Sequence, residues 1–193
     1  MNFYTEIALL PDEEVPIFFI RNKVYTKLHK AIYDLKADDI GISFPQVDKE
    51  LGCLIRVHSS NERLQELQNL NWLGGLSGYC KVGEILTIPD NIKGYQVISR
   101  IRQTMSLAKL SKRIDYQKKN GDLKTDDEVK AYERQYKAKM FQTALNNPYL
   151  ELQSTSTGNL YRIYINFSEL EQQPIKGQFN RFGLSKNATV PIF

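Results

Sequence analysis

One histidine, His29, lies on the flank of a predicted helix, where its imidazole is available for proton transfer. The sequence VYTKLHKAIYDL centres the apolar stripe of this helix near Leu28 and Leu35, roughly 100–120° around the axis from His29. An imidazole titrates near neutral pH, so it can accept a proton from a hydroxyl group and donate one when protonated. A histidine with no chemical role is the alternative, and the helix pattern alone favours it. His58, at a predicted strand end, is a second and weaker candidate.

A run of four hydroxyl residues, from Ser154 to Thr157, precedes a predicted strand. The stretch LQSTSTGNLYRIYI passes through Gly158 into a strand that carries Tyr161 and Arg162. A polar hairpin turn is one explanation for such a run. A site that holds a sugar–phosphate chain is the other, and the stretch by itself leaves both open.

The charge of the chain is unevenly distributed. Residues 1–92 contain nine Lys and Arg against 13 Asp and Glu, a net charge of −4, whereas residues 93–193 contain 17 against nine, a net charge of +8. An acidic half joined to a basic half indicates that the second half meets a polyanion. Many basic surfaces are merely solvated, so charge alone leaves nucleic acid as one of two explanations.

A predicted helix in the basic half has one cationic face. In SLAKLSKRIDYQKK the apolar side consists of Leu107, Leu110 and Ile114. The other side, spread over roughly 100°, presents Lys109, Lys112, Arg113 and Tyr116. Over about 10 Å of helix axis these side chains match the spacing of successive phosphates. A solvated amphipathic helix is the alternative.

The strand predicted before this helix adds two arginines, Arg100 and Arg102. Because they are two residues apart, the strand pleat puts them on the same face. An arginine fork can recognise guanine through two hydrogen bonds. Arginines on a strand next to a basic helix favour a nucleic-acid ligand over a solvated surface.

Several site classes are disfavoured by composition. Cys53 and Cys80 lack a CxxC partner, so we expect reduced thiols and a cytoplasmic protein. Two histidines and two distant cysteines argue against structural zinc, and the acidic pair Asp38-Asp39 resembles a loop before a strand more than a magnesium site. No apolar run approaches the roughly 18 residues of a membrane span, and the N-terminal residues lack a secretory pattern. We therefore expect no metal, no cofactor and no membrane partner.

A histidine and a serine without a metal suit one reaction on RNA. The substrate's own 2′-OH can be the nucleophile, so the protein needs a base, a group that holds the hydroxyl and a clamp on the backbone.

The first half of the chain predicts alternating strands and helices. A strand at 2–9 is followed by the acidic residues Asp12–Glu14 and Pro16, an order that suits the first turn of a helix, and this helix ends near Leu35. The buried stripe of that helix is formed by Ile17, Ile20, Val24, Leu28, Ala31 and Leu35. Two strands follow, IGISFP and CLIRVH, then a helix at 62–73 and a strand GYCKVGEILTIP. This order is the ferredoxin-like pattern, which RNA-recognition modules also use.

The second half predicts a different arrangement. A strand at 95–102 precedes a helix capped by Ser106, which Asn120-Gly121 ends, and Thr125–Met140 forms a further helix. A hairpin at 148–166 and a strand pair at 179–193 complete the chain. The expected fold class is α+β, with a ferredoxin-like, RNA-recognition-like domain at 1–92. A C-terminal α/β region with a basic RNA-binding helix follows at 93–193.

The chain resembles the CRISPR RNA-processing endoribonucleases of subtype I-F, which cut the repeat hairpin of the precursor transcript. The resemblance extends from end to end. It rests on the order and spacing of KLHKAI, IGISFP, IRVHSS, YQVISRIR, STSTG and FGLSKNATVPIF. It implies metal-independent cleavage at the 3′ base of an RNA hairpin, with a 2′,3′-cyclic phosphate product. It also implies that the protein keeps the mature guide RNA hairpin and joins the other subunits of a type I-F interference complex.

The resemblance assigns roles to individual residues. His29 matches the general base that acts on the 2′-OH, and Ser154 matches the serine that positions that hydroxyl. Ser156 and Thr157 match neighbours of the scissile backbone. Tyr161 stands where the family places a phenylalanine that stacks on the last base pair of the stem.

Three departures from the family pattern concern the site. Phe182 stands where the family often has an active-site tyrosine, so a hydroxyl group is lost. Arg102 replaces an adenine-recognising glutamine, while Arg100 matches an arginine that recognises guanine. The basic helix is mostly lysine rather than arginine, so we expect binding that is more electrostatic and more sensitive to salt.

Three alternatives to an active endoribonuclease stay open. Phe182 motivates a guide-RNA hairpin-binding subunit with weak or no cleavage. An unrelated RNA-recognition protein is a second alternative, although residues 1–92 lack the aromatic GFGFV-like strand of such modules. A metal-dependent nuclease is the third.

Overall fold

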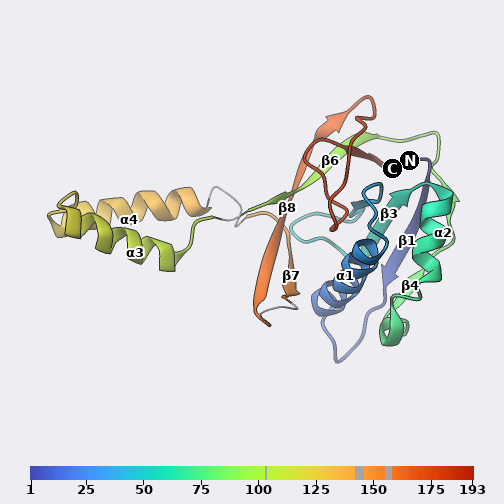
Figure 1. The fold of residues 1–193 in the computed structure, drawn as a ribbon, viewed down its shortest axis with the longest axis horizontal. Coiled ribbons are helices and arrows are strands. Elements are labelled where there is room, and N and C mark those ends of the chain that lie inside the picture. The colour runs from blue at the N-terminus through green and yellow to red at the C-terminus, as the bar shows by residue number, and fades with distance from the viewer. Residues whose placement is uncertain (103, 142–145, 155–157) are drawn as a thin grey trace. The chain divides into compact units, whose positions relative to one another are not determined.

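The chain forms two structural units. The computed structural model describes residues 1–102, 104–141, 146–154 and 158–193. The first unit contains Met1–Arg100 and Pro148–Phe193, and the second contains Ile101–Asn147 (Figure 1). This division differs from the ranges 1–92 and 93–193 that the change in charge indicated, because most of the C-terminal residues pack with the N-terminal half.

The first sheet of the large unit is antiparallel. Its strand order is β2-β3-β1-β4, and the short strand β5 also pairs with β1. The strands are β1 (Phe3–Leu9), β2 (Gly41–Ser43), β3 (Leu54–Ser59), β4 (Cys80–Val82) and β5 (Leu86–Thr87). Alternate residues of β1 are buried, as the period of a half-buried strand requires. The sequence predicted a single strand for GYCKVGEILTIP, whereas the structure has two short strands there, β4 and β5.

Two helices accompany this sheet, α1 (Ile17–Asp34) and α2 (Asn61–Asn69), and a 3₁₀ turn spans Gly74–Leu76. The predicted apolar stripe of α1 is confirmed, since Ile20, Val24, Leu28 and Ala31 are buried. The helix begins at Ile17, directly after Pro16, and its first turn contains no acidic residue, because Asp12–Glu14 lie before it. The Asp12 carboxylate instead accepts hydrogen bonds from two backbone amides that follow it and closes a turn.

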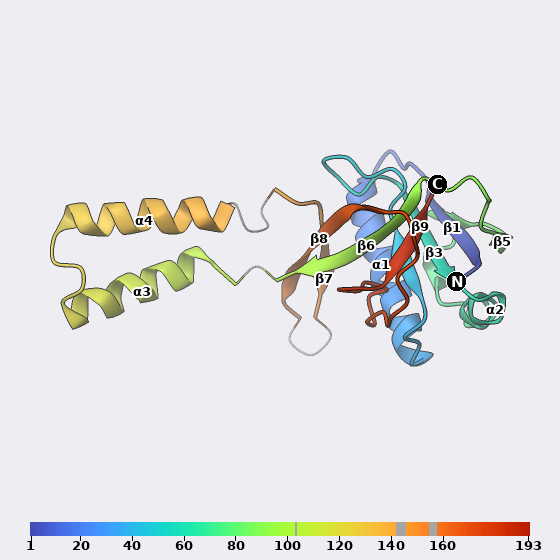
Figure 2. The ribbon, with the colours of Figure 1, turned by 90° about the horizontal axis from the view of Figure 1, so that it is seen from above.

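A second sheet in the same unit has the strand order β7-β8-β6-β9. Its strands are β6 (Gly94–Ile101), β7 (Tyr149–Gln153), β8 (Leu160–Glu171) and β9 (Thr189–Ile192). β6 and β8 lie side by side in both views of the ribbon (Figures 1 and 2). Leu150, Ile163 and Val190 belong to the same buried cluster as Ile7 and Val24. One core therefore joins the two sheets, and the division at residue 92 does not separate cores.

The predicted strand pair at 179–193 is wrong, because only β9 forms and it pairs with β6. The segment before β9 satisfies its backbone through contacts with distant elements instead. Phe179 N donates to the backbone oxygen of Asp38, and Ser185 N donates to that of Ile98. The residues before β9 therefore lie against distant parts of the chain, including α1.

The small unit consists of α3 (Leu107–Asn120) and α4 (Asp126–Met140). The predicted ends of α3 are confirmed, since Ser106 accepts from Lys109 N and Gly121 is left-handed after the last turn. Thr125, predicted as the first residue of the next helix, precedes α4 as its N-cap and forms a capping box with Glu128. The core of this unit is formed by Leu110, Ile114, Tyr136 and Met140. Leu107, predicted on the apolar side, is 60% exposed and is not part of this core.

No helix in the described part of the chain is long and apolar enough to cross a membrane.

Candidate functional site

One face of α1 holds a C-terminal loop, Asn180–Leu184, which we call the 180–184 loop. Three residues spaced four apart on α1, Tyr25, His29 and Tyr33, contact it. The Tyr25 hydroxyl donates to the Phe182 backbone oxygen at 2.5 Å, and Arg181 Nη1 donates to the Tyr33 backbone oxygen at 3.2 Å. The Arg181 guanidinium also lies over the Tyr33 ring. Burial raises the pKa of the Tyr25 phenol, so this hydroxyl remains a donor.

The protonation of the His29 ring follows from its backbone partner. His29 Nδ1 lies 2.7 Å from the Arg181 backbone oxygen. A carbonyl oxygen can only accept, so Nδ1 carries the hydrogen atom. In the neutral imidazole, Nε2 then carries the lone pair and is the nitrogen that can accept a proton. His29 is half-buried, so the ring is held in place without losing contact with solvent.

Phe182 fixes the plane of the His29 ring. The two ring centroids are 3.9 Å apart and the planes differ by 9°, which is a stacked pair. The Arg100 guanidinium carbon lies 5.8 Å from the centroid of the Phe182 ring. A cation from β6 therefore stands next to the stacked pair.

Gly183 allows the 180–184 loop to approach the first sheet. Its φ is +67°, and a Cβ atom there would lie 2.5 Å from Ile42 Cγ1. Gly183 also donates to the Asn180 backbone oxygen, and its own oxygen accepts from Ile42 N on β2. Only glycine combines this left-handed backbone with so close a contact.

Ser154 lies at the end of β7, in the connection to β8. Its backbone N donates to Asn159 O and its backbone oxygen accepts from Gly158 N. Ser154 also lines a cavity together with Thr26 of α1. Thr26 is three residues before His29 on α1. The predicted neighbours Ser156 and Thr157 lie outside the described residues.

Tyr161 is half-buried on β8, opposite Leu152 of β7, and packs against the main core. Packing against the core therefore restricts the motion of the Tyr161 side chain.

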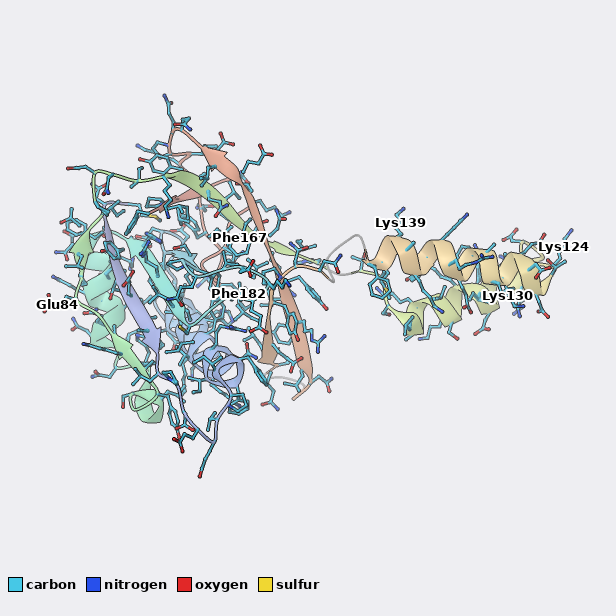
Figure 3. The ribbon with its side chains drawn as sticks, turned by 180° about the vertical axis from the view of Figure 1, so that it is seen from behind. Glu84, Lys124, Lys130, Lys139, Phe167 and Phe182 are labelled. Carbon is cyan, nitrogen blue, oxygen red and sulfur yellow. The ribbon has the colours of Figure 1, made fainter. Side chains whose placement is uncertain are left out.

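The predicted cationic face of α3 is exposed as expected. Lys109, Lys112, Arg113 and Tyr116 are all accessible to solvent. Lys109 Nζ donates to the Thr104 backbone oxygen, and the Arg113 guanidinium lies over the Tyr136 ring. α4 adds exposed cations such as Lys130, and the side chains of both helices can be followed in Figure 3.

The shared strand face predicted for Arg100 and Arg102 stays a prediction. β6 ends at Ile101, so the pleat does not orient Arg102. Arg102 is exposed and belongs to the small unit, whereas Arg100 belongs to the large one.

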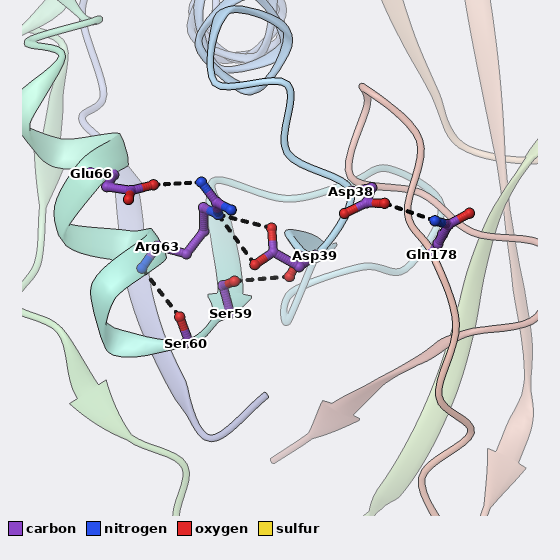
Figure 4. Close-up of polar contacts among 7 residues, drawn as sticks. All are labelled: Asp38, Asp39, Ser59, Ser60, Arg63, Glu66 and Gln178. Carbon is purple, nitrogen blue, oxygen red and sulfur yellow. Dashed lines mark hydrogen bonds and ion pairs between the residues drawn. The ribbon is translucent and has the colours of Figure 1, made fainter.

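The weaker candidates have structural roles. His58 is fully buried, and its Nε2 lies 2.8 Å from Ser43 Oγ. Burial, helped by the charge of Arg56, lowers the pKa of His58 to about 3, so the ring is neutral. Asp39 accepts from Arg63 and Asp38 accepts from Gln178, so the two carboxylates face different partners (Figure 4). In the described part of the chain no group of three His, Cys, Asp or Glu side chains could hold a metal ion.

The sequence prediction missed the residues that support His29. The spacing of Tyr25, His29 and Tyr33 was visible in the sequence and is the signal that could have indicated a shared face. The partner of this face could not be found, because Arg181 contributes through its backbone oxygen, which residue type does not reveal.

Comparison with known proteins places this arrangement in a family. A family model described as CRISPR-associated protein (Cas_Csy4) matches residues 4–193. The chain belongs to this family. A CRISPR-associated endonuclease Cas6/Csy4 of Escherichia coli (strain UTI89 / UPEC) is 34% identical over 193 residues, which is 100% of both chains. A protein with the same description from Pseudomonas aeruginosa (strain UCBPP-PA14) is 31% identical over 196 residues, again 100% of both chains. The family resemblance predicted from the sequence is confirmed.

A solved structure of the CRISPR endoribonuclease Cse3 bound to 19 nt RNA also covers 100% of both chains, with 10% identity and a TM-score of 0.36. That similarity is too low to support an argument.

We expect Gly183→Ala to destabilise the large unit by at least about 2 kcal/mol, because the methyl group meets Ile42 and the left-handed backbone is strained. Unfolding in urea, followed by the fluorescence of the single tryptophan, Trp72, measures this change. Gly78→Ala is the matched control, since a Cβ there meets nothing within 4 Å. Equal unfolding free energies for the two variants would contradict the assigned role of Gly183.

We expect the stability of the protein to depend on the protonation of His58. The pKa of His58 is lowered on folding, so its contribution is complete above the unfolded pKa and is lost as the pH falls through about 6.5 toward 3. Between about pH 7.5 and 5 the loss is about 2 kcal/mol. Unfolding curves of the wild type and His58→Gln over this range test it, and the variant should show the smaller dependence. Parallel curves would refute the buried neutral state.

Proposed function

We propose that this chain is a metal-independent endoribonuclease that cuts CRISPR precursor RNA at the 3′ base of the repeat hairpin. The observation that carries the proposal is the His29 ring, whose Nδ1–H is directed to the Arg181 backbone oxygen and whose Nε2 therefore carries the lone pair. Family membership and relatives described as CRISPR-associated endonucleases support the substrate class.

In the proposed reaction the RNA supplies its own nucleophile. His29 Nε2 accepts the proton of the 2′-OH of the nucleotide before the cut, and O2′ attacks the adjacent phosphorus. The P–O5′ bond breaks, which leaves a 2′,3′-cyclic phosphate on one fragment and a 5′-OH on the other. The imidazolium returns its proton to the departing 5′ oxygen. Ser154 positions the 2′-OH, and Ser156 and Thr157 are assigned to the backbone around the scissile phosphate.

The hairpin is assigned to the cationic surface of the protein. Lys109, Lys112, Arg113 and Tyr116 of α3 contact the phosphates of the stem, and Arg100 and Arg102 recognise bases. Tyr161 stacks on the last base pair of the stem. The small unit supports this assignment, since it carries 11 Lys and Arg against six Asp and Glu. After the cut the protein keeps the guide RNA hairpin as a subunit of a type I-F interference complex.

The proposal includes a ferredoxin-like arrangement of the first sheet. The element order β1-α1-β2-β3-α2-β4 and the antiparallel strand order β2-β3-β1-β4 support it.

We expect His29→Ala to abolish cleavage of a labelled repeat hairpin from the protein's own array, in excess chelator, while hairpin binding is kept. A substrate with a 2′-deoxy nucleotide before the cut should bind equally well and stay intact, because the nucleophile is missing. Lys30→Ala, which changes an exposed neighbour on the same helix, is the control and should cleave normally. Equal cleavage by His29→Ala and the wild type would exclude His29 as the base.

A second candidate function is a guide-RNA hairpin-binding subunit with weak or no cleavage, and Phe182 favours it because no hydroxyl is available there to orient the histidine. Tight binding of both substrates, without cleavage of either one by the wild type, would establish this function instead.

We expect Lys112→Ala combined with Arg113→Ala to weaken hairpin binding by at least about tenfold at moderate salt, because each lost phosphate contact removes a counterion-release contribution. The single-turnover cleavage rate at saturating protein should change little. Lys130→Ala combined with Arg134→Ala removes the same charge from exposed positions on α4 and is the matched control. An unchanged dissociation constant for the α3 variant, or an equal loss for the α4 variant, would contradict the assignment to α3.

A further inference from the structure

A cavity of about 450 Å³ lies between α1 and the β7–β8 hairpin. Its lining combines two exposed phenylalanines with polar side chains from the helix and the hairpin. The α1 part is formed by Phe18, Phe19, Asn22, Lys23 and Thr26. The hairpin part is formed by Glu151, Gln153, Ser154, Gly158 and Leu160. α1 and β7 are neighbours in the ribbon (Figure 1), and Glu151 N donates to Asn22 Oδ1 across this boundary.

Two of the α1 residues that line the cavity share a helix face with His29. Asn22, Thr26 and His29 are four and three residues apart, so they share one face of α1. Thr26 precedes His29 by about 4.5 Å along the helix axis. Ser154 contributes to the cavity wall from the other side. The proposed function assigns the scissile phosphate to His29 and Ser154, and Ser154 lines the cavity, so the cavity is available to a neighbouring nucleotide.

The free surface in this cavity is mainly apolar and aromatic. Phe18 is 52% exposed, Phe19 is 49% exposed and Leu160 is 67% exposed. Lys23 Nζ lies 5.2 Å from the centroid of the Phe19 ring, which places a cation beside an aromatic surface. Exposed aromatic rings next to a cation are the features that bind single-stranded nucleic acid by stacking.

Several polar groups of the lining already have partners within the protein. Thr26 Oγ1 donates to the Asn22 backbone oxygen at 2.7 Å, and Gln153 Nε2 donates to Gly158 O at 3.0 Å. Glu151 forms an ion pair with Arg162 at 2.9 Å, so its charge is compensated. These bonds favour recognition of a ring by stacking over recognition of a particular base by hydrogen bonds.

We propose that this cavity holds the base of the first nucleotide after the scissile phosphate, stacked on Phe18 and Phe19. The inference rests on the proposed function, in which the nucleotide before the cut is paired in the stem and the one after it is single-stranded. An unpaired base is free to leave its neighbours and stack on an aromatic side chain. Tight binding of the RNA therefore requires a base at this position, but any of the four RNA bases fulfils this requirement.

The test uses a repeat hairpin from the protein's own array with a 2′-deoxy nucleotide before the cut and 2-aminopurine immediately after it. The fluorescence of 2-aminopurine falls when the base stacks. Binding of the wild type should quench it, and Phe18→Ala combined with Phe19→Ala should remove the quenching. Leu70→Ala combined with Leu86→Ala is the control, since both leucines are exposed apolar residues outside the cavity.

A second measurement requires only the wild-type protein. Replacing the base after the cut by an abasic site should weaken binding about tenfold, in the range of one lost stacked base. Exchanging one natural base for another should change the dissociation constant less than threefold. Quenching that persists in the phenylalanine variant, or an abasic substrate bound as tightly as the intact one, overturns the inference.

The outcomes separate the inference from the proposed function. Quenching without cleavage of the matching all-ribose RNA supports the cavity assignment and contradicts the catalytic proposal. Tight hairpin binding and cleavage without quenching contradict the cavity assignment alone. Absence of any hairpin binding contradicts both.

Discussion

The proposed chemistry depends on the attachment of the 180–184 loop to one face of α1. His29 gains its Nδ1 partner and its stacked neighbour from this loop, and Tyr25 and Tyr33 hold the same two loop residues. The loop is in turn fixed to β2, where Ile42 N donates to Gly183 O. The orientation of one imidazole is therefore set by residues more than 150 positions later in the chain.

The phosphate contacts of the stem and the chemistry are assigned to separate parts of the protein. The small unit has 11 Lys and Arg and six Asp and Glu, a net charge of +5, so the remainder of the chain has a net charge of −1. His29, Ser154 and the 180–184 loop all belong to the nearly neutral large unit. This separation explains why changes on α3 are expected to alter affinity without altering the environment of the histidine.

Phe182 offers an orienting contact that needs no hydroxyl group. A ring stacked at 3.9 Å restricts the imidazole plane, and the Arg181 backbone oxygen restricts rotation within that plane. Together these contacts can hold Nε2 toward a substrate, which is the task that a tyrosine hydroxyl would otherwise support.

The sequence by itself determined the presence of the helices, the ends of α3 and the mixed α and β class of the fold, because these depend on interactions within a few residues. Ser106, Thr125 and Asn120-Gly121 mark helix ends through local hydrogen bonds, and the stripe of α1 follows from its own periodicity. Only the tertiary structure decided the path of 179–188, the end of β6 before Arg102 and the partners of His29. These features depend on backbone groups from distant segments, and a backbone oxygen such as that of Arg181 is the same for every residue type.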